Sequence, residues 1–209
     1  MKTKTLVAFL GGLVFLYFTK VQDDGNKKYN INEFTVPQIA GKTLFKLKKC
    51  DQCHTLKDKP KGKRTPLNSI REESWFAGHV QKESKIVLRM EKSRRKQKRV
   101  LKEEILALKE YLFQIGAKKR HFIDSLPKKI LRGAYLVYQN KCLKCHSIAG
   151  FGKDVGPDLT HIGRKHDKAW FIANLKNPQQ FAPESVMPKF SNLPEDDLEK
   201  IAEYLYSLK

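Results

Sequence analysis

Two short motifs in this 209-residue chain place a pair of thiols and an imidazole at fixed spacing: Cys50-Asp-Gln-Cys53-His54 and Cys142-Leu-Lys-Cys145-His146. They use all four cysteines, which leaves none for a structural disulfide. In such a motif each thiol can form a thioether to a haem vinyl group, and the histidine that follows can bind the iron as proximal ligand. The motifs therefore predict two covalently bound haem c groups, ligated by His54 and His146.

Other chemistry is open to the same residues. Each Cys-x-x-Cys pair could be a redox dithiol, or the two motifs together could bind zinc. A thioredoxin-like dithiol is expected between a strand and a helix of a β-α-β unit, which this sequence does not predict. A shared zinc site would have to join residues 92 positions apart, such as Cys50 and Cys142. Haem attachment is favoured because the motif occurs twice in matching surroundings.

The surroundings of the two motifs form an internal repeat. Gly41 and Gly133 each precede the first cysteine by nine residues, and Leu44 and Leu136 follow those glycines by three. Downstream, Trp75-Phe76 matches Trp170-Phe171, and Tyr111-Leu112 matches Tyr204-Leu205. Such self-similarity predicts two copies of one structural unit. We place the copies at residues 36–116 and 127–209, joined by a linker over residues 117–126.

Each copy is predicted to be a small helical bundle, so the expected fold class is all-α. Apolar residues at helical spacing predict helices over residues 40–49, 75–81 and 101–115, and again over residues 131–141, 170–176 and 196–208. A unit of roughly 80 residues is marginal on apolar burial alone. A covalently held haem would supply the missing apolar surface.

The N-terminus carries a targeting signal. A basic start, Met1–Lys4, precedes an apolar run from Leu6 to Phe18 that Lys20 closes. The run has the length of a signal-peptide core, but no Ala-x-Ala-like cleavage site follows it. We therefore expect an uncleaved signal-anchor helix over residues 1–20 and a linker over residues 21–35. Basic residues before the run would place the haem domains on the periplasmic side of a bacterial inner membrane.

Further motifs of the second copy occur in a recognisable order: Arg132-Gly133-Ala-Tyr135-Leu136, Cys142-x-x-Cys145-His146, Gly156-Pro157-Asp158-Leu159, Trp170 and Met187-Pro188-Lys-Phe190. In this order the second copy resembles a class I cytochrome c domain. The whole chain resembles dihaem cytochromes c made of two tandem class I domains.

The resemblance implies roles for particular residues of the second copy. His146 and Met187 would be the axial ligands of the iron, and the Pro157 carbonyl would accept the His146 ring N–H. Gly133 would lie where the first and last helices cross, close to Tyr204. The resemblance also implies that Trp75 and Trp170 lie at the two haems.

The first copy departs from this pattern. Its methionine, Met90, has no proline after it, but the repeat alignment puts it close to the ligand position, so we expect Met90 to be the sixth ligand. His79 competes for this role. It follows Trp75 by four residues and aligns with Asn174, a position that the family does not use for iron.

The charge balance favours acidic partners. Formal net charge is +20, and no nucleic-acid fold signature accompanies it. The basic run Glu91–Arg99 is either a solvated helix extension or a patch for docking or anionic lipid. Redox proteins with acidic surfaces and the membrane are the expected partners, and no small-molecule substrate is expected.

Two haems whose irons each bind a histidine and a methionine have no free coordination position for a substrate, so we expect an electron-transfer protein and not an enzyme. It would be tethered to the membrane and carry electrons between respiratory-chain components, with a quinol-oxidising or terminal oxidase complex as a possible setting. The rival hypothesis is a dihaem enzyme, a peroxidase or a sulfur-compound-oxidising cytochrome, with an open first haem.

Overall fold

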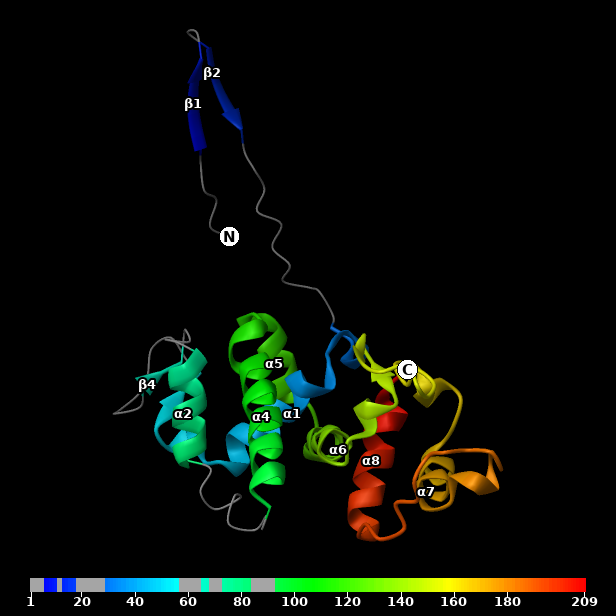
Figure 1. The fold of residues 1–209 in the computed structure, drawn as a ribbon. Helices are drawn as coiled ribbons and strands as arrows, with labels where there is room; N and C mark the ends of the chain where they lie inside the picture. Colours follow the sequence, from blue (N-terminus) through cyan, green and yellow to red (C-terminus); the bar gives the residue numbers. More distant parts are fainter. Residues whose placement is uncertain (1–5, 11–12, 18–28, 57–64, 68–72, 84–92) are drawn as a thin grey trace.

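The computed structural model describes residues 6–10, 13–17, 29–56, 65–67, 73–83 and 93–209, and most of these are helical (Figure 1). The helices are α1 (Val36–Leu47), α2 (Glu73–Glu83), α4 (Arg94–Lys109) with a π-turn η3 (Glu110–Gln114), α5 (Ala117–Ser125), α6 (Lys128–Gln139), α7 (Lys168–Lys176) and α8 (Glu195–Ser207). Short 3-10 turns are η1 (Ile31–Glu33), η2 (Cys50–Gln52), η4 (Cys142–Lys144), η5 (Ile162–Arg164) and η6 (Pro178–Gln180).

Strands are few and short. They pair as β1 (Leu6–Leu10) with β2 (Leu13–Tyr17), β3 (His54–Thr55) with β4 (Thr65–Pro66), and β5 (Ser147–Ile148) with β6 (Phe151–Gly152). Helices over the described residues agree with the expected all-α class.

The N-terminal segment differs from the expected helix over residues 1–20. Strands β1 and β2 pair antiparallel, from Leu6 opposite Tyr17 to Leu10 opposite Leu13. Two glycines separate the strands in sequence, which is a common spacing in β-hairpins, and Val, Phe and Tyr favour extended backbone. No helix in the described part of the chain is long and apolar enough to cross a membrane.

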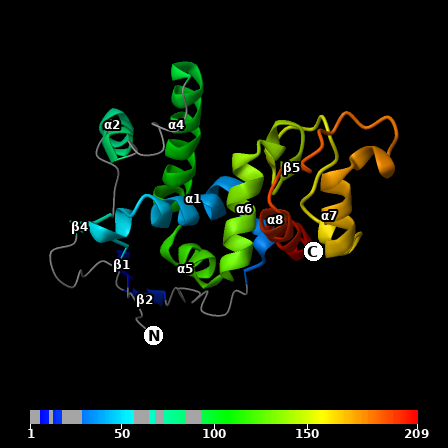
Figure 2. The ribbon, with the colours of Figure 1, turned by 90° about the horizontal axis from the view of Figure 1, so that it is seen from below.

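Helices α1 and α6 begin the two repeated units and lie side by side, as both ribbon views show (Figures 1 and 2). The Thr43 hydroxyl on α1 donates a hydrogen bond to the Leu131 carbonyl on α6, at 3.0 Å. α1 also packs against α4, and α6 packs against α8, which in turn contacts α7. The four helices α4, α1, α6 and α8 are therefore packed in series.

Glycines permit the two closest crossings. A Cβ atom on Gly133 would lie 2.0 Å from the Lys200 carbonyl oxygen and 2.7 Å from Cβ of Tyr204. On Gly41 it would lie 2.1 Å from the Ala107 carbonyl oxygen. Only a residue without a side chain lets the helices approach so closely. The crossing of Gly133 with Tyr204 is thereby confirmed, and Gly41 makes the same kind of crossing with the α4 helix.

Residues 117–126, expected as a linker, contain helix α5. Asp124 of this helix accepts a hydrogen bond from the Tyr111 hydroxyl and pairs with Lys42, both at 2.6 Å. Arg120 donates to the carbonyl oxygens of Leu112 and Ile115 at the end of the π-turn. The segment is thus tied to the helices on its N-terminal side.

Candidate haem-attachment sites

The second motif begins where helix α6 ends. Lys141 adopts the left-handed conformation, with φ 64°, and turns the chain into η4. The Cys142 carbonyl oxygen then accepts hydrogen bonds from the backbone N–H of Cys145 (3.1 Å) and of His146 (3.0 Å). This tight turn holds both thiols and the imidazole on one short stretch of backbone.

The His146 ring is oriented by the loop that follows. Its Nδ1 lies 2.8 Å from the carbonyl oxygen of Pro157, the contact that the cytochrome resemblance implies. Since a carbonyl only accepts, Nδ1 must carry the proton, and Nε2 keeps a lone pair for a metal. A Cβ on Gly156 would lie 2.7 Å from Cε1 of His146, so a glycine is needed for the loop to come this close.

The same loop is held by a second set of hydrogen bonds. Asp158 accepts from the Ser147 hydroxyl at 2.5 Å and from the backbone N–H of Thr160 at 2.8 Å. Burial is the largest single influence on the pKa of Asp158 and raises it, but the hydrogen bonds from Ser147 and Thr160, together with the nearby His161, lower that pKa below its ordinary value. Leu159 N–H donates to the Ser147 carbonyl at 2.9 Å. The loop therefore holds its position beside the imidazole.

Met187 is half-buried, and three side chains contact it: Gln179, Ser185 and Asn174. The Gln179 side chain donates to the carbonyl oxygens of Ser185 (2.9 Å) and Met187 (3.1 Å), and the Met187 N–H donates to the Ser185 hydroxyl (3.2 Å). Asn174 Nδ2 lies 4.0 Å from the Met187 sulfur. Sequence reasoning named Met187 but missed Asn174, Gln179 and Ser185. Among these, only Asn174 carried a signal, through its alignment with His79.

The first motif repeats the backbone of the second. Lys49 is left-handed, with φ 55°, and the Cys53 N–H donates to the Cys50 carbonyl at 3.3 Å. Beyond it, Leu67 N–H donates to the Thr55 carbonyl at 3.0 Å. This is the counterpart of the Leu159 bond described above, at the same 92-residue offset.

Thr65 therefore stands in the first copy where Pro157 stands in the second. It pairs with His54 in the parallel β3–β4 bridge. Extending the 92-residue offset past the motif would have found it, but the sequence around residue 65 does not otherwise resemble the second copy. His54 Nδ1 is buried and has no hydrogen-bond partner in the part of the chain that the structure describes. In the second copy the same ring nitrogen bonds to the Pro157 carbonyl, and Nε2 is the one left for a metal.

Around the first motif, the structure brings together two residues that the sequence singled out. The His79 ring lies with its centroid 5.7 Å from that of His54, and the Trp75 ring stacks on His79 at 5.1 Å. Met90, the expected sixth ligand, lies outside the described residues. Trp170 of the second copy stacks on His166 instead.

The alternative chemistries fit these surroundings less well. Burial raises the pKa of the Cys142 thiol to about 11, whereas a redox dithiol needs a lowered value. Among the described residues, no group of three or more His, Cys, Asp or Glu side chains is placed to hold a metal ion. Haem fits the donor set, because each turn offers two thiols and one imidazole, and no disulfide joins the four cysteines.

Comparison with known proteins points the same way. Residues 150–207 match the family described as FixO, cytochrome c oxidase, mono-heme subunit. Over 86 residues the chain is 30% identical to cytochrome c oxidase subunit 2 of Alkalihalophilus pseudofirmus. The aligned region covers 37% of this chain and 25% of the length of that protein. No solved structure matches. These matches, with the geometry at His146, support a c-type cytochrome.

Proposed function

We propose that this protein is a dihaem cytochrome c that carries electrons in a respiratory chain ending in a terminal oxidase. The observation that carries the proposal is the His146 ring, held by the Pro157 carbonyl with Nε2 left for iron, at the end of a Cys-x-x-Cys turn. The repeated turn at Cys50 supports a second haem. The oxidase setting is supported by the two similarities, which concern parts of oxidase subunits.

The residues of each proposed site have different roles. The cysteines hold the haem covalently, and the haem, when bound, supplies a one-electron carrier. In the second site His146 and Met187 are the proposed axial ligands, and the hydrogen bonds from Gln179 hold the methionine loop in place. A closed iron has no position for substrate, which favours electron transfer over catalysis.

In the first site Cys50, Cys53 and His54 have the same proposed roles. Trp75 and Trp170 are proposed to lie against the two haems. For the sixth ligand of this site the sequence offers two candidates, Met90 and His79.

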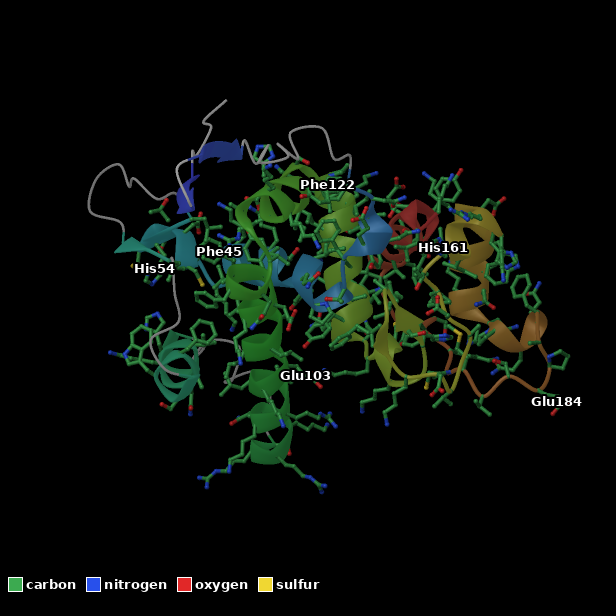
Figure 3. All side chains as sticks on the ribbon, turned by 90° about the horizontal axis from the view of Figure 1, so that it is seen from above. Phe45, His54, Glu103, Phe122, His161 and Glu184 are labelled. Carbon is green, nitrogen blue, oxygen red and sulfur yellow. The ribbon has the colours of Figure 1, made fainter. Side chains whose placement is uncertain are left out.

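A composite basic surface supports docking of an acidic redox protein. Arg99 on α4 and Lys144 in the second motif are exposed, and both lie close to Lys141. Burial, Arg99 and Lys144 lower the pKa of Lys141 to about 8, even though Glu103 of α4 pairs with it. Figure 3 shows Glu103 on α4, whose first turns, all basic or polar, extend away from the other helices. The positive charge therefore collects beside the second attachment site.

The test of this surface uses substitutions that remove positive charge. Replacing Arg99 and Lys144 with glutamine should slow reduction of the protein by ferrocyanide, an anionic donor, and flatten the dependence of the rate on salt. A variant with both Lys128 and Lys129 replaced by glutamine, at the opposite end of α6, also removes two exposed positive charges and serves as control. Equal slowing in the control variant would show that only net charge matters.

Membrane tethering by residues 1–20, with the haem domains on the periplasmic side, is part of the proposal. Its support is the basic start and the apolar run. Cell fractionation at high salt measures it: a protein that retains its Met1 end and stays with the membranes fits, and a freely soluble protein that begins near Lys20 does not.

The central experiment counts haems and follows their redox behaviour. Protein matured with a haem-attachment system should gain the mass of two haems, and a variant with Cys142 and Cys145 both replaced by alanine should gain one. Both irons should be low-spin and reversibly reducible. Peroxide or sulfur-oxyanion turnover at an iron that binds carbon monoxide without mutation would contradict the electron-carrier proposal.

A further inference from the structure

Helix α2 presents two neighbouring faces with different roles. Phe76 and Val80, one turn apart, are buried, and the Phe76 ring meets the Phe113 ring edge-on at 5.5 Å. This apolar face seats α2 against the π-turn that ends α4. Trp75 and His79 are also one turn apart and therefore share the adjacent face. Packing of the Phe76 and Val80 face therefore determines the direction of the face that carries Trp75 and His79.

That second face meets the first haem-attachment turn. The Trp75 indole stacks on the His79 imidazole with 5° between their planes, which restrains the imidazole. The His79 and His54 rings are 5.7 Å apart between centroids, with 80° between their planes. In Figure 3 the labelled His54 lies on the same side of the molecule as α2.

This separation suits two ligands of one metal. Two imidazoles that bind a metal from opposite sides have centroids roughly 6 Å apart, since each metal–nitrogen bond is about 2.0 Å and the nitrogen lies about 1 Å from the ring centre. The observed 5.7 Å needs only a small outward shift.

The internal repeat gives an independent reason. His79 follows Trp75 by four residues, as Asn174 follows Trp170 by four. Asn174 Nδ2 lies 4.0 Å from the sulfur of Met187, the proposed sixth ligand of the second site. If Met187 binds the second haem, the equivalent place in the first copy would lie across a bound haem from His54. There the chain has an imidazole and not an amide.

We propose that His79, and not Met90, is the sixth ligand of the first haem. This rests on the proposed dihaem function. Since a thioether ligand raises the potential of haem iron relative to imidazole, the first site would have the lower reduction potential. Electrons would then pass downhill from the first site to the second. The basic surface at Arg99 and Lys144 lies beside the second site, where they would leave.

The test is spectroscopic and uses the full chain with its haems attached. In oxidised wild-type protein, the far-red charge-transfer band of methionine-ligated iron should have the intensity of one such haem for every two present. Met90→Leu should leave this band and both midpoint potentials unchanged. His79→Met should double the band and raise the lower potential. His79→Ala should make one iron high-spin and able to bind carbon monoxide.

The opposite pattern overturns the inference. Wild-type protein with two methionine-ligated haems, one of which is lost in Met90→Leu, would assign the ligand to Met90. The wild-type band and the Met90→Leu variant decide the matter even if the His79 variants do not fold. A protein that carries one haem only, at Cys142 and Cys145, would overturn the dihaem function together with this inference.

Discussion

Replacing Gly133 with alanine should destabilise the contact between α6 and α8. The new Cβ would lie 2.0 Å from the Lys200 carbonyl oxygen and 2.7 Å from Cβ of Tyr204, whereas ordinary contacts begin at 3.4 Å. Neither atom can rotate away, because one belongs to the backbone and the other is attached directly to it. The helices must therefore move apart, which loosens the packing of Ile201 and Leu205 on α8.

The size of the effect follows from two opposing terms. Overpacking a core costs about 1–3 kcal/mol, and a clash with backbone belongs at the upper end of that range. Alanine recovers about 1 kcal/mol of helix propensity relative to glycine. We therefore expect a net loss of about 2 kcal/mol. If residues 127–209 unfold as one unit, Tm should fall by about 8–16 °C.

Gly78→Ala is the matched control, since Gly78 lies inside α2 with no atom within 4 Å of the added Cβ. The same chemical change should there stabilise by up to about 1 kcal/mol. Thermal and urea unfolding, followed by far-ultraviolet circular dichroism on protein with haem attached, would measure both variants. If Gly133→Ala unfolded within about 2 °C of the Gly78→Ala protein, the steric reasoning would be refuted.

Three further substitutions test other parts of the structure. Gly41→Ala should be about as destabilising as the change at the equivalent crossing, by about 2 kcal/mol in the same unfolding assay. Gly156→Ala would put a Cβ 2.7 Å from Cε1 of His146, so the ring should turn, its hydrogen bond should weaken and the second haem's midpoint potential should change in redox titration. Glu104→Leu should cost about 3–5 kcal/mol in urea unfolding, because it leaves Lys48 buried without its carboxylate partner at 2.7 Å. Adding Lys48→Met should recover most of that loss, and no recovery would contradict the ion-pair explanation.

The helices and the backbone geometry around His146 were largely predictable because their determinants are local. Apolar spacing predicted α4 and α8 to within several residues of their observed ends. The approach of Gly133 to Tyr204 and the hydrogen bond at His146 were expected from the cytochrome resemblance. Glycine and a rigid Gly-Pro loop are required there by close contact, so the residue types themselves indicate the geometry.

In two segments the structure has elements that the sequence did not indicate, because their local signals are ambiguous. The apolar run from Leu6 to Phe18 suits a helix or a strand equally, and its two central glycines lower helix propensity enough to favour pairing of strands. Helix α5 has little apolar periodicity. Its position depends on Phe122, which stacks on Phe34 at 5.2 Å, and on Asp124, both of which contact distant parts of the chain.

The sequence by itself determined the two Cys-x-x-Cys-His turns, the repeat that relates them and the basic charge of the chain. Tertiary structure decided which side chains surround those turns: Gln179 and Asn174 at Met187, and His79 facing His54. It also decided that Arg99 of the first copy lies close enough to Lys141 of the second to lower its pKa. The physical reason is that a turn is closed by hydrogen bonds between neighbouring residues, whereas these pairs lie from 8 to 42 positions apart and meet only when the chain folds.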